Sequence, residues 1–120
     1  MLVNKTTGKT IIEKTRLAST AWNRLRGLMF EKQELFDYAL VFCLPREGIM
    51  PASIHMLFVF FPIDIVFLDK NKKTVDIVRG IKPFTPNYAP KNPAKFFIEL
   101  PETMAKGIKL GDVLEWKSSS

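Results

Sequence analysis

Three apolar runs, each bounded by proline or by charged residues, restrict most strongly which folds this chain can adopt. Residues 39–44 are apolar on both sides of an extended backbone and stop at Pro45. A second run spans 54–61 and stops at Pro62, and a third follows over 63–68, broken only by Asp64. Short runs that are apolar on both sides are typical of strands buried in a sheet. They predict a β-sheet core with a bend or an edge at Pro62.

Turn-forming residues divide much of the remaining chain into short strands. Polar turns over 5–9 and 69–73 predict two hairpins, one near the start of the chain and one after the third apolar run. Strand character returns near the end of the chain and closes it. Beyond the three apolar runs, the predicted strands are 2–4, 10–12, 74–81, 95–100 and 113–116.

Two segments have helical character. Ala21, Trp22, Leu25 and Leu28 fall on one stripe, so 20–28 predicts a helix of about two turns. A second helical turn is expected over 102–106. One short helix and a mostly antiparallel, curled or barrel-like sheet define an α+β domain.

The length and the apolar content of the chain limit its organisation and location. With 120 residues, 47% of them apolar, we expect one globular domain over 1–117 and a frayed tail over 118–120. The single cysteine, Cys43, excludes an internal disulfide and suits a reducing compartment. The longest uncharged stretch, 48–63, contains two prolines and is shorter than the roughly 20 residues of a membrane-spanning helix. We therefore predict a cytoplasmic protein without a membrane span.

The formal net charge of +6 is unevenly distributed along the chain. Residues 1–26 carry +5 and residues 70–95 carry +6, whereas 27–69 carry −4. If the two basic blocks shared one face, a nucleic-acid-binding domain would be a candidate. Lysines that alternate with apolar residues are more often the solvated side of a strand, so this remains an alternative.

Four motifs in order resemble one known family. They are Arg24-Leu25-Arg26-Gly27-Leu28-Met29, Met56 with Pro62-Ile63-Asp64-Ile65-Val66-Phe67-Leu68-Asp69, Ile98-Glu99-Leu100-Pro101, and Gly107-Ile108-Lys109-Leu110-Gly111-Asp112. In this order the chain resembles the uncharacterised protein family 0127, also called domain of unknown function 192. The resemblance implies a compact β-rich fold with minor helices, and it implies no activity, substrate or cofactor.

His55 and Asp64 are the candidates for chemistry. His55 is the only histidine, and its near-neutral pKa would suit proton transfer or metal ligation, but no further ligands surround it. Asp64 has apolar flanks, so it must be hydrogen-bonded, paired or protonated, with Arg24 or Arg26 as the candidate partner. A polar anchor is the structural interpretation of Asp64, and a hydrolase-like or metal-assisted enzyme using both residues is the functional one. We expect no resident metal or cofactor.

Two other residues have conventional expectations. Cys43 lies among apolar residues in mid-strand, which predicts a desolvated and inert thiol. Glu99 alternates with Ile98 and Leu100, which predicts an acid that faces solvent or pairs with arginine.

We expect a binding surface at the segment 82–93, because it holds four of the eight prolines and forms a long loop that cannot be a helix or a central strand. Phe84 and Tyr88 could present their rings over a groove, or pack beneath the loop. Our preferred function is a non-enzymatic binding or interaction domain that takes a peptide, a partner protein or an apolar small molecule. The predicted ligand-binding residues are Phe84, Tyr88, Met56, Asp64 and Arg24.

Overall fold

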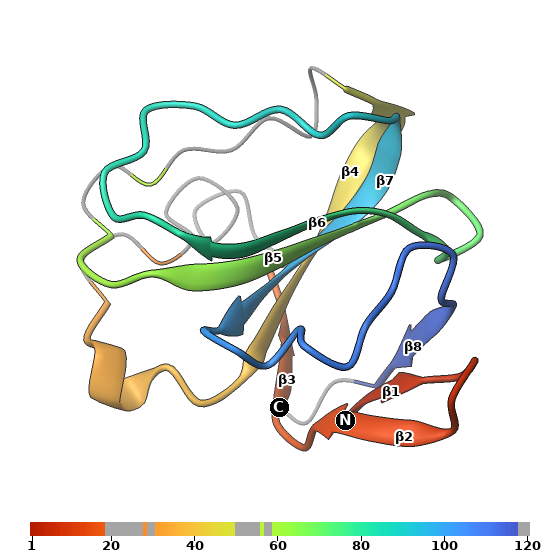
Figure 1. The fold of residues 1–120 in the computed structure, drawn as a ribbon, viewed down its shortest axis with the longest axis horizontal. Coiled ribbons are helices and arrows are strands. Elements are labelled where there is room, and N and C mark those ends of the chain that lie inside the picture. The colour runs from red at the N-terminus through yellow and green to blue at the C-terminus, as the bar shows by residue number, and fades with distance from the viewer. Residues whose placement is uncertain (19–27, 29–30, 50–55, 57–58, 118–120) are drawn as a thin grey trace.

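The computed structural model describes residues 1–18, 28, 31–49, 56 and 59–117 (Figure 1). In chain order its elements are β1 (Leu2–Asn4), β2 (Lys9–Ile12), β3 (Thr15–Leu17), η1 (Gln33–Leu35), β4 (Ala39–Gly48), β5 (Ile63–Leu68), β6 (Thr74–Ile81), β7 (Ala94–Pro101) and β8 (Leu114–Trp116). These strands form a three-stranded sheet, β2-β1-β8, and a five-stranded sheet, β3-β4-β7-β5-β6. Among them, only the β3–β4 pair is parallel.

Both predicted hairpins are present. In the first, β1 pairs with β2 and Asn4 lies opposite Lys9. In the second, β5 pairs with β6 around a turn in which Asp69 Oδ1 accepts hydrogen bonds from the backbone N–H groups of Asn71 (2.8 Å) and Lys73 (3.0 Å). An aspartate that bonds its own turn in this way fixes the hairpin locally, so the sequence was sufficient to predict it.

The five-stranded sheet has an apolar cluster on each face. One face, which we call the loop face, carries Leu40, Phe42, Ile65, Phe67 and Phe97, and the loop residue Tyr88 packs against this cluster. On the other, which we call the small-sheet face, Val66, Leu68 and Ile98 pack with Leu2 and Leu114 of the three-stranded sheet. All six residues of β5 are buried, because this strand is covered on both faces.

The predicted α+β class is wrong, since the described residues are nearly all β. Their one helix is η1, a 3-10 helix of three residues. The predicted helix over 20–28 lies outside the described residues except for Leu28, which is buried. The predicted helical turn over 102–106 forms a series of turns instead, because Thr103 adopts a φ of +76° that a right-handed helix does not allow.

A barrel-like closure is also wrong, because both sheets are open. In the five-stranded sheet β3 and β6 occupy opposite edges. A third expectation needs revision at Pro45, where β4 was predicted to stop. The strand continues to Gly48, but its register with β7 shifts between Cys43 and Gly48. Proline cannot donate a ladder hydrogen bond, so it is tolerated here at an irregularity.

Candidate functional site

The proline-rich loop, residues 82–93, is fastened to β6 by the buried carboxylate of Asp76. The Tyr88 hydroxyl donates to Asp76 Oδ2 (2.7 Å), and the Lys91 backbone N–H donates to the same oxygen (3.2 Å). Asp76 Oδ1 accepts from the backbone N–H of Ile77 (2.9 Å). Burial, together with the neighbouring carboxylate, raises the pKa of Tyr88 to about 12, so its hydroxyl keeps its proton and remains a donor.

The beginning of the loop is held by the backbone of Met56. The Phe84 N–H donates to the Met56 carbonyl (2.8 Å), and the Met56 N–H donates to the Thr85 carbonyl (2.7 Å). The Thr85 hydroxyl also closes a local turn by donating to the Lys82 carbonyl (2.7 Å). Met56 itself is fully buried. The loop is therefore fixed at two places, near Phe84 and near Tyr88.

The two aromatic residues of the loop point in different directions. Tyr88 is half-buried and stacks on Phe67 of β5, with 5.8 Å between ring centroids. Phe84 is 47% exposed and contacts Phe60, which is 58% exposed, edge to face at 5.3 Å. We call these two residues the Phe60–Phe84 pair. Of the two predicted rings, the structure thus leaves Phe84 more accessible and packs Tyr88 against the core.

The backbone of Phe84 is strained, with a φ of +62°. A bulky residue in the left-handed region costs on the order of 1–3 kcal/mol, and such strain persists only where surrounding contacts impose it. Here the backbone bonds to Met56 supply those contacts. The loop therefore holds an apolar ring at the surface in a conformation that a free chain would avoid.

Asp64 lies on the opposite face of the sheet from this loop. Its Oδ1 accepts from the backbone N–H of Gly80 (2.9 Å), and its Oδ2 accepts from that of Ala105 (2.9 Å). Both oxygens of this buried carboxylate are thus engaged by the backbone, which agrees with the interpretation as a polar anchor. Glycine suits this contact, since Gly80 has a φ of +65°, a backbone conformation that residues with a side chain rarely adopt.

The structure does not gather the predicted site residues in one place. Phe84, Tyr88 and Met56 belong to the loop and the cluster beneath it, whereas the Asp64 carboxylate bonds Ala105, which belongs to the small-sheet cluster. Arg24 and His55 lie outside the described residues. In the part of the chain that is described, no group of histidine, cysteine, aspartate or glutamate residues could hold a metal ion.

Glu99 is the residue that sequence reasoning misjudged most. It was expected to face solvent or pair with arginine, yet it is buried on the loop face between Leu40 of β4 and Ile65 of β5. Within the described chain its Oε1 has no hydrogen-bond partner. Burial therefore raises the pKa of Glu99 to about 8. Its alternation with apolar residues looks like that of a half-exposed strand, and only the central position of β7 reveals the burial.

The expected burial of Cys43 is also wrong, because this thiol is exposed. It follows Val41 and Phe42, which are buried, and it directly precedes the irregular part of β4 around Pro45. The cover over the strand therefore ends at about this residue. The sequence places Cys43 within an apolar run, but it does not show that the buried part of the strand ends before this residue.

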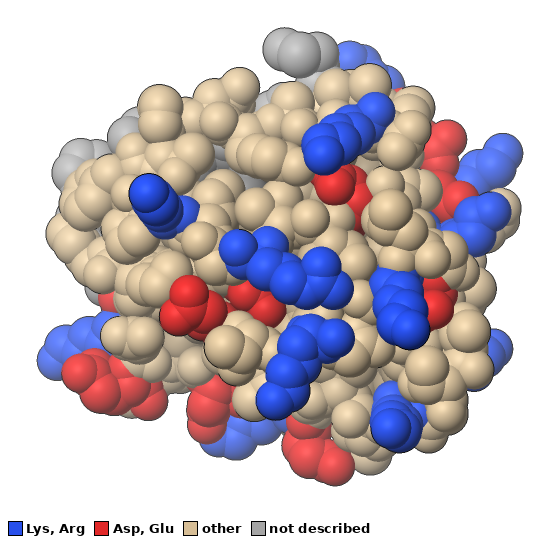
Figure 2. Space-filling model, viewed as in Figure 1, with Lys and Arg blue, Asp and Glu red and all other residues tan. Residues whose placement is uncertain are grey.

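Basic side chains are dispersed over the face shown in Figure 2, with acidic and uncharged side chains between them. Two ion pairs are found among the described residues, Lys5 with Glu115 (3.8 Å) and Lys14 with Asp37 (2.6 Å). The dispersed pattern differs from the contiguous basic face that would favour nucleic-acid binding. Across the described residues, no helix is both long and apolar enough to cross a membrane.

Comparison with known proteins gives consistent matches along nearly the whole chain. The family model DUF192, described as "Uncharacterized ACR, COG1430", matches residues 2–116. A UPF0127 protein from Thermococcus sibiricus is 40% identical over 98% of this chain and 75% of its own length. Another, from Pyrococcus furiosus, is 41% identical over 96% of this chain and 97% of its own length.

Two solved structures share the fold. A protein of unknown function from Novosphingobium aromaticivorans has a TM-score of 0.82 at 24% identity, covering 96% of this chain and 82% of its own. A proposed transcription regulator from Sinorhizobium meliloti has a TM-score of 0.79 at 23% identity, covering 95% of this chain and 88% of its own. At this level of identity the similarity concerns the fold alone.

Proposed function

This chain belongs to the DUF192 family, also named UPF0127, and we propose that it is a small non-enzymatic binding domain that recognises an apolar side chain of a peptide or partner protein. The observation that carries the proposal is the Phe60–Phe84 pair. Two phenylalanine rings lie edge to face at the surface, and one of them belongs to a residue with a strained backbone. Aromatic anchors of this kind dominate the binding energy of many protein interfaces.

The way the loop is held supports this function. Its hydrogen bonds to Met56 and Asp76 fix the position of Phe84 before a ligand arrives. The four prolines of the loop restrict its backbone further. A surface that is already ordered loses less conformational entropy on binding, so a modest apolar contact retains more of its affinity.

The predicted residues take different parts in this proposal. Phe84 contacts the ligand, while Met56 and Tyr88 hold the loop. Asp64 supports β6 from the other face, and Arg24 stays a predicted contact outside the described residues. We place the activity in the cytoplasm, because a single unpaired cysteine suits a reducing compartment.

The enzyme alternative has less support, since Asp64 uses both carboxylate oxygens to hold backbone N–H groups. The nucleic-acid alternative rests on the positive charge and on the proposed role of the Sinorhizobium meliloti protein, which shares the fold at 23% identity. Neither explains why an apolar aromatic pair is held at the surface.

A selection with random peptides tests the proposal. A phage-displayed library of random peptides is selected on the immobilised protein, and binders are compared on a double variant, Phe60→Ser with Phe84→Ser. We expect the enriched peptides to share an apolar residue and to bind the double variant at least about tenfold more weakly, since each ring contributes roughly 1–2 kcal/mol.

Leu110→Ser is the matched control, because Leu110 is also an exposed apolar residue (66%) but lies between β7 and β8. The enriched peptides should bind the Leu110→Ser variant with the same affinity as the unmodified protein. The proposal is wrong if no peptide is enriched, or if the double variant binds the enriched peptides as well as the unmodified protein does.

A further inference from the structure

A second surface stands apart from the proline-rich loop. The segment between β7 and β8, residues 102–113, which we call the β7–β8 loop, crosses the side of the molecule that faces the viewer in Figure 1. Some residues of this loop are buried against the small-sheet cluster, and others between them are exposed to solvent. Ala105 and Ile108 are fully buried in the small-sheet cluster. The apolar residues Met104 (43% exposed) and Leu110 (66% exposed) project outward.

The β7–β8 loop is held rigidly by polar contacts from three other elements. Asp64 of β5 accepts from the Ala105 N–H (2.9 Å), and the Arg79 guanidinium of β6 donates to the Ile108 carbonyl (2.7 Å). Asn4 of β1 donates through Nδ2 to Asp112 Oδ2 (2.8 Å). The exposure of Met104 and Leu110 is therefore a property of an ordered loop.

Charge on this loop is positive at its surface. Lys106 and Lys109 are exposed beside the two apolar residues. Of the two acids in the loop, Asp112 is buried and turned inward, since its Oδ2 also accepts from the Lys109 N–H (2.9 Å). These hydrogen bonds lower the pKa of Asp112, which keeps it ionised within the loop. Glu102 is the exposed acid.

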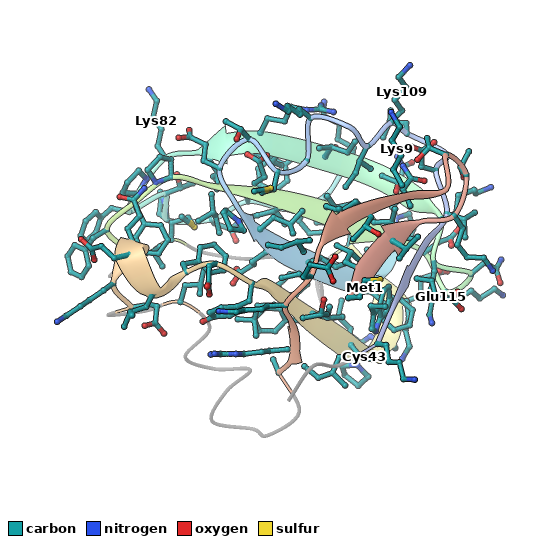
Figure 3. The ribbon with its side chains drawn as sticks, turned by 90° about the horizontal axis from the view of Figure 1, so that it is seen from below. Met1, Lys9, Cys43, Lys82, Lys109 and Glu115 are labelled. Carbon is teal, nitrogen blue, oxygen red and sulfur yellow. The ribbon has the colours of Figure 1, made fainter. Side chains whose placement is uncertain are left out.

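One further lysine, Lys9, lies beside this loop among the dispersed basic residues of the same side (Figure 3). Figure 3 shows Lys9 and Lys109 projecting from the side of the molecule that faces the viewer in Figure 1, whereas Lys82 projects from the same side at the other end of the molecule. Lys9 lies next to the loop, because it pairs with Asn4, whose side chain donates to the Gly107 carbonyl (3.4 Å). The loop thus presents aliphatic side chains with lysines on and around it.

We propose that the β7–β8 loop docks on the surface of an anionic phospholipid bilayer, with Leu110 and Met104 entering the interfacial region while Lys106 and Lys109 contact the headgroups. Combined apolar burial and attraction between lysine and anionic lipid is the general basis of peripheral membrane binding. Lysine phosphate contacts would equally suit a nucleic acid. Single-stranded nucleic acids, however, are held largely by aromatic side chains that stack on their bases, and the exposed apolar residues of this loop are aliphatic.

Vesicle co-sedimentation tests this proposal. The protein is mixed with vesicles of phosphatidylcholine alone and with vesicles in which about a third of the lipid is phosphatidylserine. We expect binding to the anionic vesicles that weakens at high salt, because salt screens the lysines. The double variant Met104→Ser with Leu110→Ser should bind about tenfold more weakly, and each of Lys106→Gln and Lys109→Gln about fivefold more weakly.

The double variant Leu35→Ser with Lys32→Gln is the matched control. It changes an exposed leucine (59%) within η1 and an exposed lysine that directly precedes η1. This control should bind the vesicles as the unmodified protein does. Circular dichroism and the melting temperature should be unchanged in every variant, since all the substituted side chains are exposed. A difference in vesicle binding between these variants therefore cannot be attributed to a change in folding.

Three outcomes overturn the proposal. The first is the absence of binding to anionic vesicles at low salt. The second is binding that the loop variants and the control variant reduce equally. The third is stronger binding to a single-stranded or duplex oligonucleotide that depends on Lys106 and Lys109 but not on Leu110, which would assign this side to a nucleic acid.

Discussion

Asp64 and Glu99 show how differently two acids with apolar neighbours behave. Each lies in an inner strand of the five-stranded sheet, and each is buried. Asp64 is satisfied by two backbone N–H groups, whereas Glu99 has an oxygen without a hydrogen-bond partner in the described chain. The flanking residues suggested a polar anchor or a catalytic group for the first acid and a solvent-facing or arginine-paired residue for the second. The difference is set by what lies across the sheet, which neighbours in sequence do not reveal.

Glu99 gives a prediction for the pH dependence of stability. Its pKa is about 8 in the folded protein, above the ordinary value of 4.5, so the folded state binds its proton more tightly than the unfolded state. Between these two values stability should fall as the pH rises, because folding then opposes ionisation. Glu99→Gln should remove this fall. Each pKa unit corresponds to about 1.4 kcal/mol. The free energy of unfolding of Glu99→Gln, minus that of the unmodified protein, should therefore be several kcal/mol larger at pH 8 than at pH 4.5.

Urea unfolding across this pH range measures the effect. Glu34→Gln is the control, since Glu34 is exposed on η1 and its substitution should leave the pH profile unchanged. Parallel profiles for the unmodified protein and Glu99→Gln would show that Glu99 titrates normally in the folded state.

At the scale of elements, local signals were reliable where turns and alternation set the structure. Both hairpins and the closing strand were predicted, because polar turns such as the one built on Asp69 fix them locally. The expected turn of helix over 102–106 failed, because Asp64 and Arg79 hold this segment from distant strands. The open edges of the sheet and the parallel β3–β4 pair are likewise set by long-range contacts. A single sequence does not display such contacts.

The candidate site was predicted in the same uneven way. The proline-rich loop was chosen because of its composition, and Phe84 is indeed exposed there. Phe60 belongs to the apolar run 54–61, which was expected to form a buried strand, yet it is exposed and contacts Phe84. No local pattern distinguishes Phe60 from its buried neighbour Phe61.

The fastening of the proline-rich loop can be tested with Tyr88→Phe. This change removes the hydroxyl that donates to Asp76 Oδ2 and keeps the ring on Phe67. A hydrogen bond to a carboxylate contributes about 1.5–3 kcal/mol, so we expect a loss of stability of this order. Hydrogen exchange at the Lys91 amide, which bonds the same oxygen, should become faster.

Asn87→Ala is the control within the same loop, because Asn87 is exposed. It should change neither the stability nor the exchange of Lys91. Equal exchange in Tyr88→Phe and in the unmodified protein would mean that Asp76 holds the loop without the tyrosine.

At the scale of the whole molecule, the two sheets share one apolar cluster. Leu2 and Leu114 of the three-stranded sheet pack with Val66 and Ile98 of the five-stranded sheet. Trp116 also contacts Phe96 of β7 edge to face at 5.1 Å. Each sheet therefore covers apolar surface of the other, and neither is expected to unfold alone.

Cooperative unfolding is the corresponding prediction. In a Trp22→Phe background Trp116 is the only tryptophan, and its fluorescence reports on the three-stranded sheet. Circular dichroism reports on all strands. The two signals should follow one urea transition with the same midpoint, as expected of a single small domain. Truncation after residue 117 should not move this midpoint, whereas separate transitions would show two independently stable units.

The place of β1 has a consequence for biosynthesis. This strand lies between β2 and β8, with Leu2 opposite Trp116, although the two residues belong to opposite ends of the described chain (Figure 1). On the ribosome, β8 leaves the exit tunnel after every other described strand. Until then β1 pairs only with β2, and the apolar side of this hairpin stays exposed to solvent. The last pairing of the three-stranded sheet therefore waits until residues 114–116 have left the tunnel, and a nascent chain stalled before residue 114 would expose this apolar surface to chaperones.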